Sequence, residues 1–210
     1  MIGMFKKDLI VLKNNFSAVY LVAIIMPLVL TLQVPDFFPF VISMLCAFLL
    51  ASQVISSMTY DENTKWEKIV RAMPIPVKVE VYSKYLLGLS FSALSALMTA
   101  LILLLHSLFF SSATTIIFYF ALFSFSIGVL HSIVIIPAAY KLGTVKCRIL
   151  YMLFIMIPVG STVLLEFLGI ELSTSIFAIP IPALVALLFA ILLCGLYASI
   201  LLSVKFRAVK

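Results

Sequence analysis

The stretch that decides the fold is YLLGLSFSALSALMTALILLLHSLFF, residues 85–110, which contains no Asp, Glu, Lys or Arg. A helix needs about 20 apolar residues to cross roughly 30 Å of hydrocarbon, so this stretch is long enough to span a membrane. Similar runs recur along the 210-residue chain, which is 65% hydrophobic and only 10% charged. Soluble domains carry roughly 25% charged residues. The sequence therefore predicts an all-α, polytopic membrane protein that forms a single transmembrane domain over residues 1–210.

The apolar runs and the polar residues between them predict six transmembrane helices. The spans lie at about residues 16–34, 38–59, 85–110, 115–139, 149–169 and 177–204. Six spans leave no room for a separate soluble catalytic domain.

The distribution of basic residues predicts the orientation, because cytoplasmic loops are enriched in Lys and Arg. All 14 Lys and Arg lie before the first span, between spans two and three, between spans four and five, or after span six. The opposite loops carry only Asp36, Glu166 and Glu171. Both termini are therefore predicted to be cytoplasmic.

The longest polar interval, the cytoplasmic loop 60–84, predicts a short amphipathic helix. Thr64 and Glu67 have the spacing of a capping box, which would start the helix, and Pro74 and Pro76 would end it. The apolar side chains at helical spacing are Trp66, Ile69, Val70 and Met73. Such a helix can lie on the lipid interface or dock into a groove of a partner. The mixed charges of its polar face favour docking.

Two flanking segments are also predicted to be helical. Residues 1–15 form an amphipathic pattern that indicates a helix along the inner membrane surface. Its apolar stripe consists of Ile2, Phe5, Leu9, Leu12 and Phe16. After the loop helix, Glu80 precedes Lys84 by four residues, which is the spacing of a favourable ion pair on a helix that continues into span three.

Residues that could carry chemistry inside the membrane are almost absent from the sequence. His106 and His131 each stand alone on a span, without a neighbouring carboxylate, which favours a packing role over a proton relay. Cys46, Cys147 and Cys194 show no spacing typical of a disulfide framework or a zinc site. The sequence contains no GxxxxGK[ST], HExxH or GxSxG motif. We therefore expect no catalytic residue, no metal ligand and no bound cofactor, and we predict that the chain is not an enzyme.

Helix breakers and small residues mark two further features of the spans. Pro158 and Gly160 lie in the fifth span, where they predict either a kink lining a pathway or a simple packing kink. Span three carries small residues that allow close helix approach. These are Ser90, Ser92, Ala93, Ser95 and Ala96.

Residues 60–86, YDENTKWEKIVRAMPIPVKVEVYSKYL, resemble the first cytoplasmic loop of the membrane permeases of type-2 ATP-binding-cassette (ABC) exporters. The shared features are an acidic start, a Trp-Glu pair, a Met-Pro-Ile stop and a Lys-Tyr entry into span three. The six spans, the internal termini and the N-terminal amphipathic helix are similar as well. Within the family the chain looks like the small permeases of bacteriocin and phenol-soluble-modulin exporters. Its outer segment at 166–175 is shorter than that of larger relatives.

The resemblance implies a permease in the bacterial cytoplasmic membrane whose loop helix, a coupling helix, inserts into a separate ABC ATPase. The residues that would contact the ATPase are Glu62, Trp66, Glu67, Ile69, Val70 and Met73. Two ATPase copies, which bind ATP and Mg, would act with two permease chains, either identical or paralogous. The cargo would be amphipathic or hydrophobic, a membrane-active peptide or a lipid, and nucleic acid is not an expected partner.

Two other functions remain open from the sequence. The first is a scaffold or immunity protein that binds a peptide or partner without transport. The second is a lipid-modifying enzyme, although the lack of buried acids, bases and metal ligands counts against it.

Overall fold

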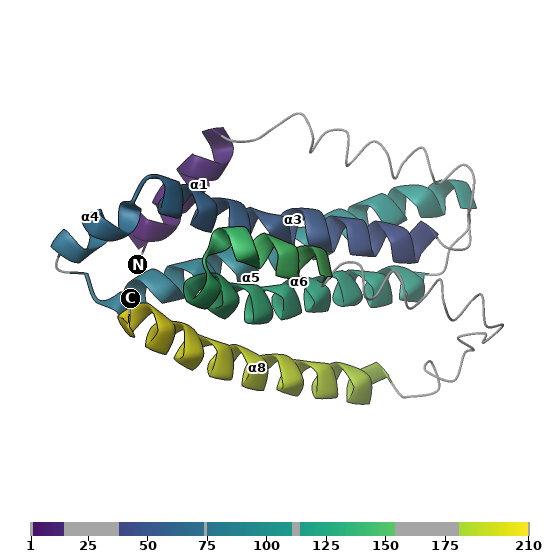
Figure 1. Ribbon diagram of the computed structural model, residues 1–210. Coiled ribbons are helices and arrows are strands. Elements are labelled where there is room, and N and C mark those ends of the chain that lie inside the picture. The colour runs from purple at the N-terminus through teal and green to yellow at the C-terminus, as the bar shows by residue number, and fades with distance from the viewer. Residues whose placement is uncertain (1, 15–37, 74, 111–113, 154–180, 210) are drawn as a thin grey trace.

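The computed structural model describes residues 2–14, 38–73, 75–110, 114–153 and 181–209 (Figure 1). Within these residues the regular structure is helical throughout, as the sequence predicts. The helices are α1 (Ile2–Asn14), α3 (Phe38–Asn63), α4 (Trp66–Ala72), α5 (Val77–Phe110), α6 (Thr114–Leu142) and α8 (Ile181–Val209). A further helical segment occupies residues 144–153.

Four of the described helices are long and apolar enough to cross a membrane. They cover Pro39–Asn63, Val77–Ser107, Ile117–Leu142 and Phe189–Ala208, which confirms the second, third, fourth and sixth predicted spans. The first predicted span lies outside the described residues, and so does most of the fifth, with Pro158 and Gly160. The six-span topology and the kink at Pro158 and Gly160 thus stay predictions.

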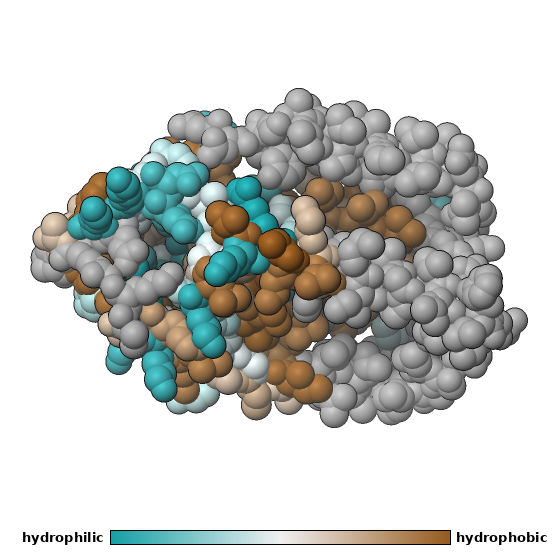
Figure 2. Space-filling model, in the orientation of Figure 1, coloured by the Kyte–Doolittle hydropathy of each residue, from teal (hydrophilic) through white to brown (hydrophobic). Residues whose placement is uncertain are grey.

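The bundle has α6 at its centre. This helix packs against α3, α5 and α8, while α8 also contacts α5. The helices α1 and α4 and the C-terminal end of α8 lie at one end of the bundle (Figure 1). On the face shown in Figure 2, hydrophilic residues gather toward this end. We call this end of the bundle the polar end. That it faces the cytoplasm is a prediction from the sequence.

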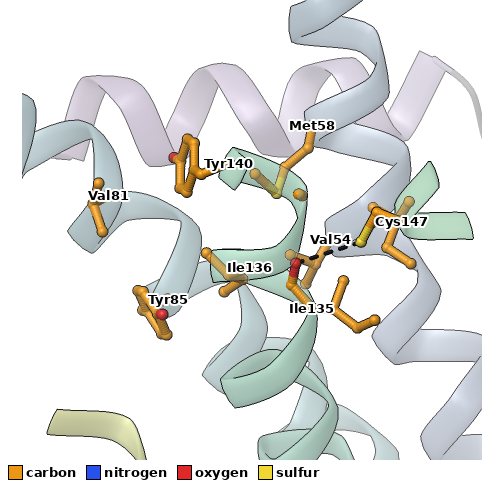
Figure 3. Packing of buried hydrophobic residues seen from close by; sticks show 10 residues of the cluster. Val54, Met58, Val81, Tyr85, Ile135, Ile136, Tyr140 and Cys147 are labelled. Carbon is orange, nitrogen blue, oxygen red and sulfur yellow. Dashed lines mark hydrogen bonds between the residues drawn. The ribbon is translucent and has the colours of Figure 1, made fainter. Parts of the chain in front are cut away.

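A hydrophobic cluster next to the polar end packs α3, α5 and α6 together. Figure 3 shows Val54 and Met58 of α3 on one side of Ile136 and Tyr140 of α6, with Tyr85 of α5 on another. Ile135 and Ile136 are completely buried. The buried apolar side chains of this cluster hold the ends of α3, α5 and α6 together next to the charged residues of the polar end.

Small residues let α5 and α6 approach closely as antiparallel neighbours. A Cβ added to Gly88 would lie 2.5 Å from the Ser132 hydroxyl, and one added to Gly128 would lie 3.1 Å from the Cα of Ser92. Each of these serines donates its hydroxyl to the glycine carbonyl one turn earlier on its own helix, so both serine hydroxyls are hydrogen-bonded. The close approach predicted for span three is confirmed at Ser92 and Ser95, which are buried, whereas Ser90 and Ala93 are exposed.

Pro137 interrupts the hydrogen bonds of α6, a break that the sequence analysis did not single out. Proline has no N–H, so the carbonyl of Ile133, four residues earlier, loses its helical donor. The Ser199 hydroxyl of α8 donates to this carbonyl at 2.6 Å. Ser199 also bonds the Tyr85 hydroxyl, which bonds Ser203 at 2.8 Å. The break in α6 is therefore satisfied by α8, as a membrane interior requires.

We predict that Gly128→Ala destabilises the α5–α6 pair. The added methyl group meets the Ser92 backbone, which cannot move aside by changing a rotamer, and overpacking of this kind costs about 1–3 kcal/mol. Gly3→Ala is the control, because a Cβ there meets nothing within 4 Å. Thermal unfolding of the purified variants in detergent measures the difference. Adding Ser92→Gly should recover part of the loss, and a Gly128→Ala variant as stable as Gly3→Ala would contradict the close contact.

Candidate functional site

The loop helix predicted between spans two and three is present as α4, but it starts differently from the prediction. Thr64 is not its N-cap: the Thr64 hydroxyl donates to the Tyr60 carbonyl at 2.9 Å, at the end of α3. The N-cap is Lys65, in the left-handed conformation with φ 53° and without a side-chain cap bond. The capping-box prediction is therefore wrong, because α3 continues to Asn63 and uses Thr64 to satisfy its own last turn.

The apolar residues of α4 do not share one exposed face. Ile69 is 45% exposed and Met73 41% exposed, whereas Val70 is buried. Trp66 is half-buried, and the Lys7 ammonium of α1 lies 4.7 Å from the centre of its ring. Of the predicted apolar contact residues, only Ile69 and Met73 thus offer exposed side chains to a partner. Lys65 and Lys68 next to them are exposed as well.

Four charged residues from three helices meet beneath α4, and we call them the charge cluster: Lys7, Asp8, Asp61 and Lys84. Lys84 of α5 is only 3% exposed, and its ammonium donates to Asp8 at 2.9 Å, to Asp61 at 2.5 Å and to Ser57 at 2.7 Å. An ammonium has three N–H donors, so each of them has an acceptor. Lys7 of α1 contacts the same two carboxylates, Asp61 at 2.5 Å and Asp8 at 2.8 Å. The cluster therefore ties α1, α3 and α5 together.

Asp61 is placed against the field of its own helix. It lies in the last turn of α3, where the helix dipole is negative and a carboxylate is unfavourable. Lys7 and Lys84 offset this cost by holding both carboxylate oxygens. Burial by itself lowers the pKa of Lys7, but the hydrogen bonds and charges of Asp61 and Asp8 outweigh it and raise that pKa above its ordinary value. Lys7 therefore stays charged at neutral pH.

Glu80 does not pair with Lys84, in contrast to the prediction from their spacing. It forms two parallel hydrogen bonds of 3.0 Å with the Arg207 guanidinium, and both side chains are buried. A guanidinium matches a carboxylate in this two-bond geometry. The pair fastens the end of α8 to the start of α5. Glu80 and Lys84 thus stabilise different tertiary contacts instead of a local pair.

Glu62, a predicted ATPase contact, is bonded within the protein. Its carboxylate accepts hydrogen bonds from the backbone N–H of Thr144, at 2.9 Å, and from the Thr144 hydroxyl. Thr144 follows Gly143, whose φ of 85° ends α6, and it begins the helical segment 144–153. A carboxylate is favourable at the start of a helix, where the helix dipole is positive. Glu62 therefore links the end of α3 to the start of the helical segment 144–153. For Glu67, only its place in α4 is described, not its side chain.

A pocket of about 100 Å³ opens between the charge cluster and the Glu80–Arg207 pair. Sites for small organic ligands usually measure about 300–1,000 Å³, so this pocket is too small for one. Its lining residues are Met58, Asp61, Glu62, Glu80, Lys84, Ala139, Tyr140, Thr144 and Arg207. The site is therefore suited to joining helices and not to binding a cargo.

The N-terminal helix packs on the bundle with a face that differs from the predicted stripe. Met4, Asp8 and Leu12 are buried at four-residue spacing, while Leu9 and Ile10 are exposed. The predicted stripe was chosen by hydrophobicity, and it missed Asp8, which turns inward to reach Lys84. Whether the outer side of α1 lies on lipid stays a prediction.

The two span histidines also have a defined place. His106 and His131 are both buried, and the ring of His131 packs edge-on against the ring of Tyr151 at 5.0 Å. The Tyr151 hydroxyl in turn donates to the Phe48 carbonyl at 2.9 Å. This arrangement accords with the predicted packing role of His131.

Comparison with known families identifies the kind of protein that holds this site. The sequence model of a family described as ABC-2 family transporter protein matches residues 3–207. The chain belongs to the ABC-2 transporter family. Comparisons with curated proteins and with solved structures gave no match. An ABC-2 permease is a multi-pass membrane subunit for transport, is not itself the ATPase, and acts with an ATP-binding partner subunit.

Some functional groups of this ABC-2 permease escaped the sequence analysis. The pattern of residues 60–84 located α4. From the sequence, however, Lys7 and Arg207 served only to predict the orientation, Lys84 was also paired locally with Glu80, and Asp8 was given no role. One signal was available: Asp8 is the single acidic residue of a helix that contains Lys6, Lys7 and Lys13.

We predict that Lys84→Met strongly destabilises the ABC-2 permease. The substitution leaves Asp8 and Asp61 buried with fewer donors, and removal of one partner from a buried ion pair costs about 3–5 kcal/mol. The matched control is Lys78→Met, an exposed lysine in the first turns of α5, with an expected effect within about 0.5 kcal/mol. Thermal unfolding in detergent compares the two variants. Equal stabilities would show that the cluster does not hold α1, α3 and α5 together.

Proposed function

We propose that the chain is the permease of an ATP-driven exporter, and that a separate ABC ATPase docks on α4. The observation that carries the proposal is the exposed apolar pair Ile69, in α4, and Met73, its C-cap, on a short helix that is itself fixed to the bundle. The helix α4 is held in place by Val70, which is buried, and by the contact of Trp66 with Lys7 of α1. Family membership supplies the reason to expect an ATP-binding partner.

The proposal assigns different roles to the predicted contact residues. Ile69 of α4 and Met73, the residue that caps the C-terminal end of α4, make the direct contact, since both side chains are exposed. Trp66 and Val70 set the position of α4, whereas Glu62, an exposed residue at the end of α3, is bonded to Thr144. In an interface a few well-packed apolar anchors supply most of the binding energy, so we assign this anchoring role to Ile69 and Met73.

The assembly and cargo extend the proposal. Two permease chains, identical or paralogous, act with two ATPases that bind ATP and Mg, in a bacterial cytoplasmic membrane. The cargo is a membrane-active peptide or a lipid-like molecule, because spans rich in Phe, Leu, Ile and Met suit an amphipathic substrate better than a hydrophilic one. The likeness of residues 60–86 to the loop of bacteriocin and phenol-soluble-modulin exporters supports the same class of cargo.

We predict that the double substitution Ile69→Ser with Met73→Ser releases the ATPase while the permease stays folded. Loss of apolar anchors should weaken binding at least about tenfold, which is about 1.4 kcal/mol. The measurement is affinity purification of the tagged chain from its native membrane, with identification of bound proteins and an assay of ATP hydrolysis.

The matched control for this experiment is Val145→Ser, an exposed apolar residue at the polar end but outside α4. This variant should keep its ATPase. Undiminished ATPase binding in the double variant would exclude α4 as the docking site. A wild-type chain that is stable and carries no nucleotide-binding partner would support a scaffold or immunity protein instead.

We further predict ATP-dependent movement of an amphipathic peptide by the reconstituted complex. Vesicles that contain permease and ATPase, with ATP supplied on the ATPase side, should accumulate a fluorescent amphipathic helical peptide but not a hydrophilic peptide of equal length. Transport of both peptides, or of neither, would contradict the assigned cargo class.

A further inference from the structure

The side-chain contact between Lys7 of α1 and Trp66 of α4 connects α4 with the charge cluster. Among the described helices, the backbone of α4 comes close only to that of α3. The lateral link to α1 is the Lys7 ammonium over the Trp66 ring, and Lys7 is held in turn by Asp61 and Asp8. Lys84 carries the connection on to α5.

We propose that Asp8 of α1 is a positioning residue that holds α4 in place through the charge cluster, and that it is the member from which the cluster can open. Asp8 touches neither Trp66 nor the exposed residues of α4, so its influence passes through Lys7 and Lys84. The importance of this link for transport rests on the proposed function, whereas the link itself does not.

The bonding of the two carboxylates shows why the cluster opens at Asp8. Asp61 accepts through both oxygens, Oδ1 from Lys7 and Oδ2 from Lys84. Asp8 holds both lysines through Oδ1 alone, and its Oδ2 is buried without a hydrogen-bond partner among the described residues. When Asp8 leaves, Lys84 keeps Asp61 and Ser57, so α3 and α5 remain joined.

Separation of α1 therefore has a directed consequence. After Asp8 is released, the Lys7–Asp61 pair is the ionic contact of the cluster that still holds α1. When this contact breaks as well, Lys7 leaves the Trp66 ring together with α1, and α4 loses its lateral support while the α3–α5 contact persists. The membrane helices and α4 move together when the cluster is closed, and α4 turns more freely when it is open. A bundle with two such arrangements can transmit a change at one site to another.

The experiment uses Trp66 as a reporter, since it is the single tryptophan of the chain. The full-length protein, purified in detergent without any ATPase, is compared with Asp8→Asn by tryptophan emission and by acrylamide quenching. We expect Asp8→Asn to shift the emission to longer wavelength and to increase quenching. Lys7→Met, which removes the direct contact, sets the size of the full effect. Asp8→Asn added to Lys7→Met should produce no further change, because the two act along one path.

The matched control is Glu80→Gln, which removes the charge of another buried carboxylate, one that bonds Arg207 and not the cluster. It should leave Trp66 unchanged, and Asp8→Glu, which keeps the charge, should restore wild-type emission. If Asp8→Asn does not fold, hydrogen exchange of the wild-type protein replaces it: the amides of α1 and α4 should open together, and before those of α3 and α5. A folded Asp8→Asn protein with wild-type Trp66 emission, an equal shift in Glu80→Gln, or α4 amides that open independently of α1 would overturn the proposal. Because no ATPase is present, either result is independent of whether α4 docks one.

Discussion

A charged lysine inside a helical bundle must find an acceptor for each of its three N–H groups, and the arrangement of the polar end follows from this requirement at Lys84. The acceptors come from two helices, Asp8 from α1 and Ser57 and Asp61 from α3, while Lys84 itself lies on a third helix, α5. No single helix could supply them. The helices can therefore pack here only when these ion pairs form. An unpaired buried charge costs about 3–5 kcal/mol of stability, whereas a surface ion pair stabilises by only about 0–1 kcal/mol.

The same rule operates deeper in the bundle with uncharged groups. Pro137 opens the backbone of α6, and the carbonyl it frees is bonded by Ser199 of α8, which is linked in turn to Tyr85. Where α5 meets α6, the hydroxyls of Ser92 and Ser132 are bonded on their own helices, and each of these serines lies against a glycine of the other helix. Polar groups therefore hold α8 to the bundle, whereas small size brings α5 and α6 together.

The sequence predicted the described helices correctly, but it did not predict which side chains pair across them. Length and hydrophobicity depend on consecutive residues, so four spans and the helices α1 and α4 could be located from local patterns. The pairing of Glu80 with Lys84 and the cap at Thr64 were also inferred locally. Thr64 is instead bonded to the Tyr60 carbonyl at the end of α3, and Glu80 has a tertiary partner. Glu80 is bonded to Arg207, which is 127 positions away, and a distant partner leaves no trace in helical spacing.

The length of α5 has a mechanical consequence. Its 34 residues form an uninterrupted rod of about 51 Å at 1.5 Å per residue, while the hydrocarbon layer measures only about 30 Å. The first turns, which carry Glu80 and Lys84, lie in the part that extends past the apolar segment. The helix is thus a lever: tilting of its long arm among the spans swings the short arm in the opposite direction, and with it both ends of the chain that are fastened there.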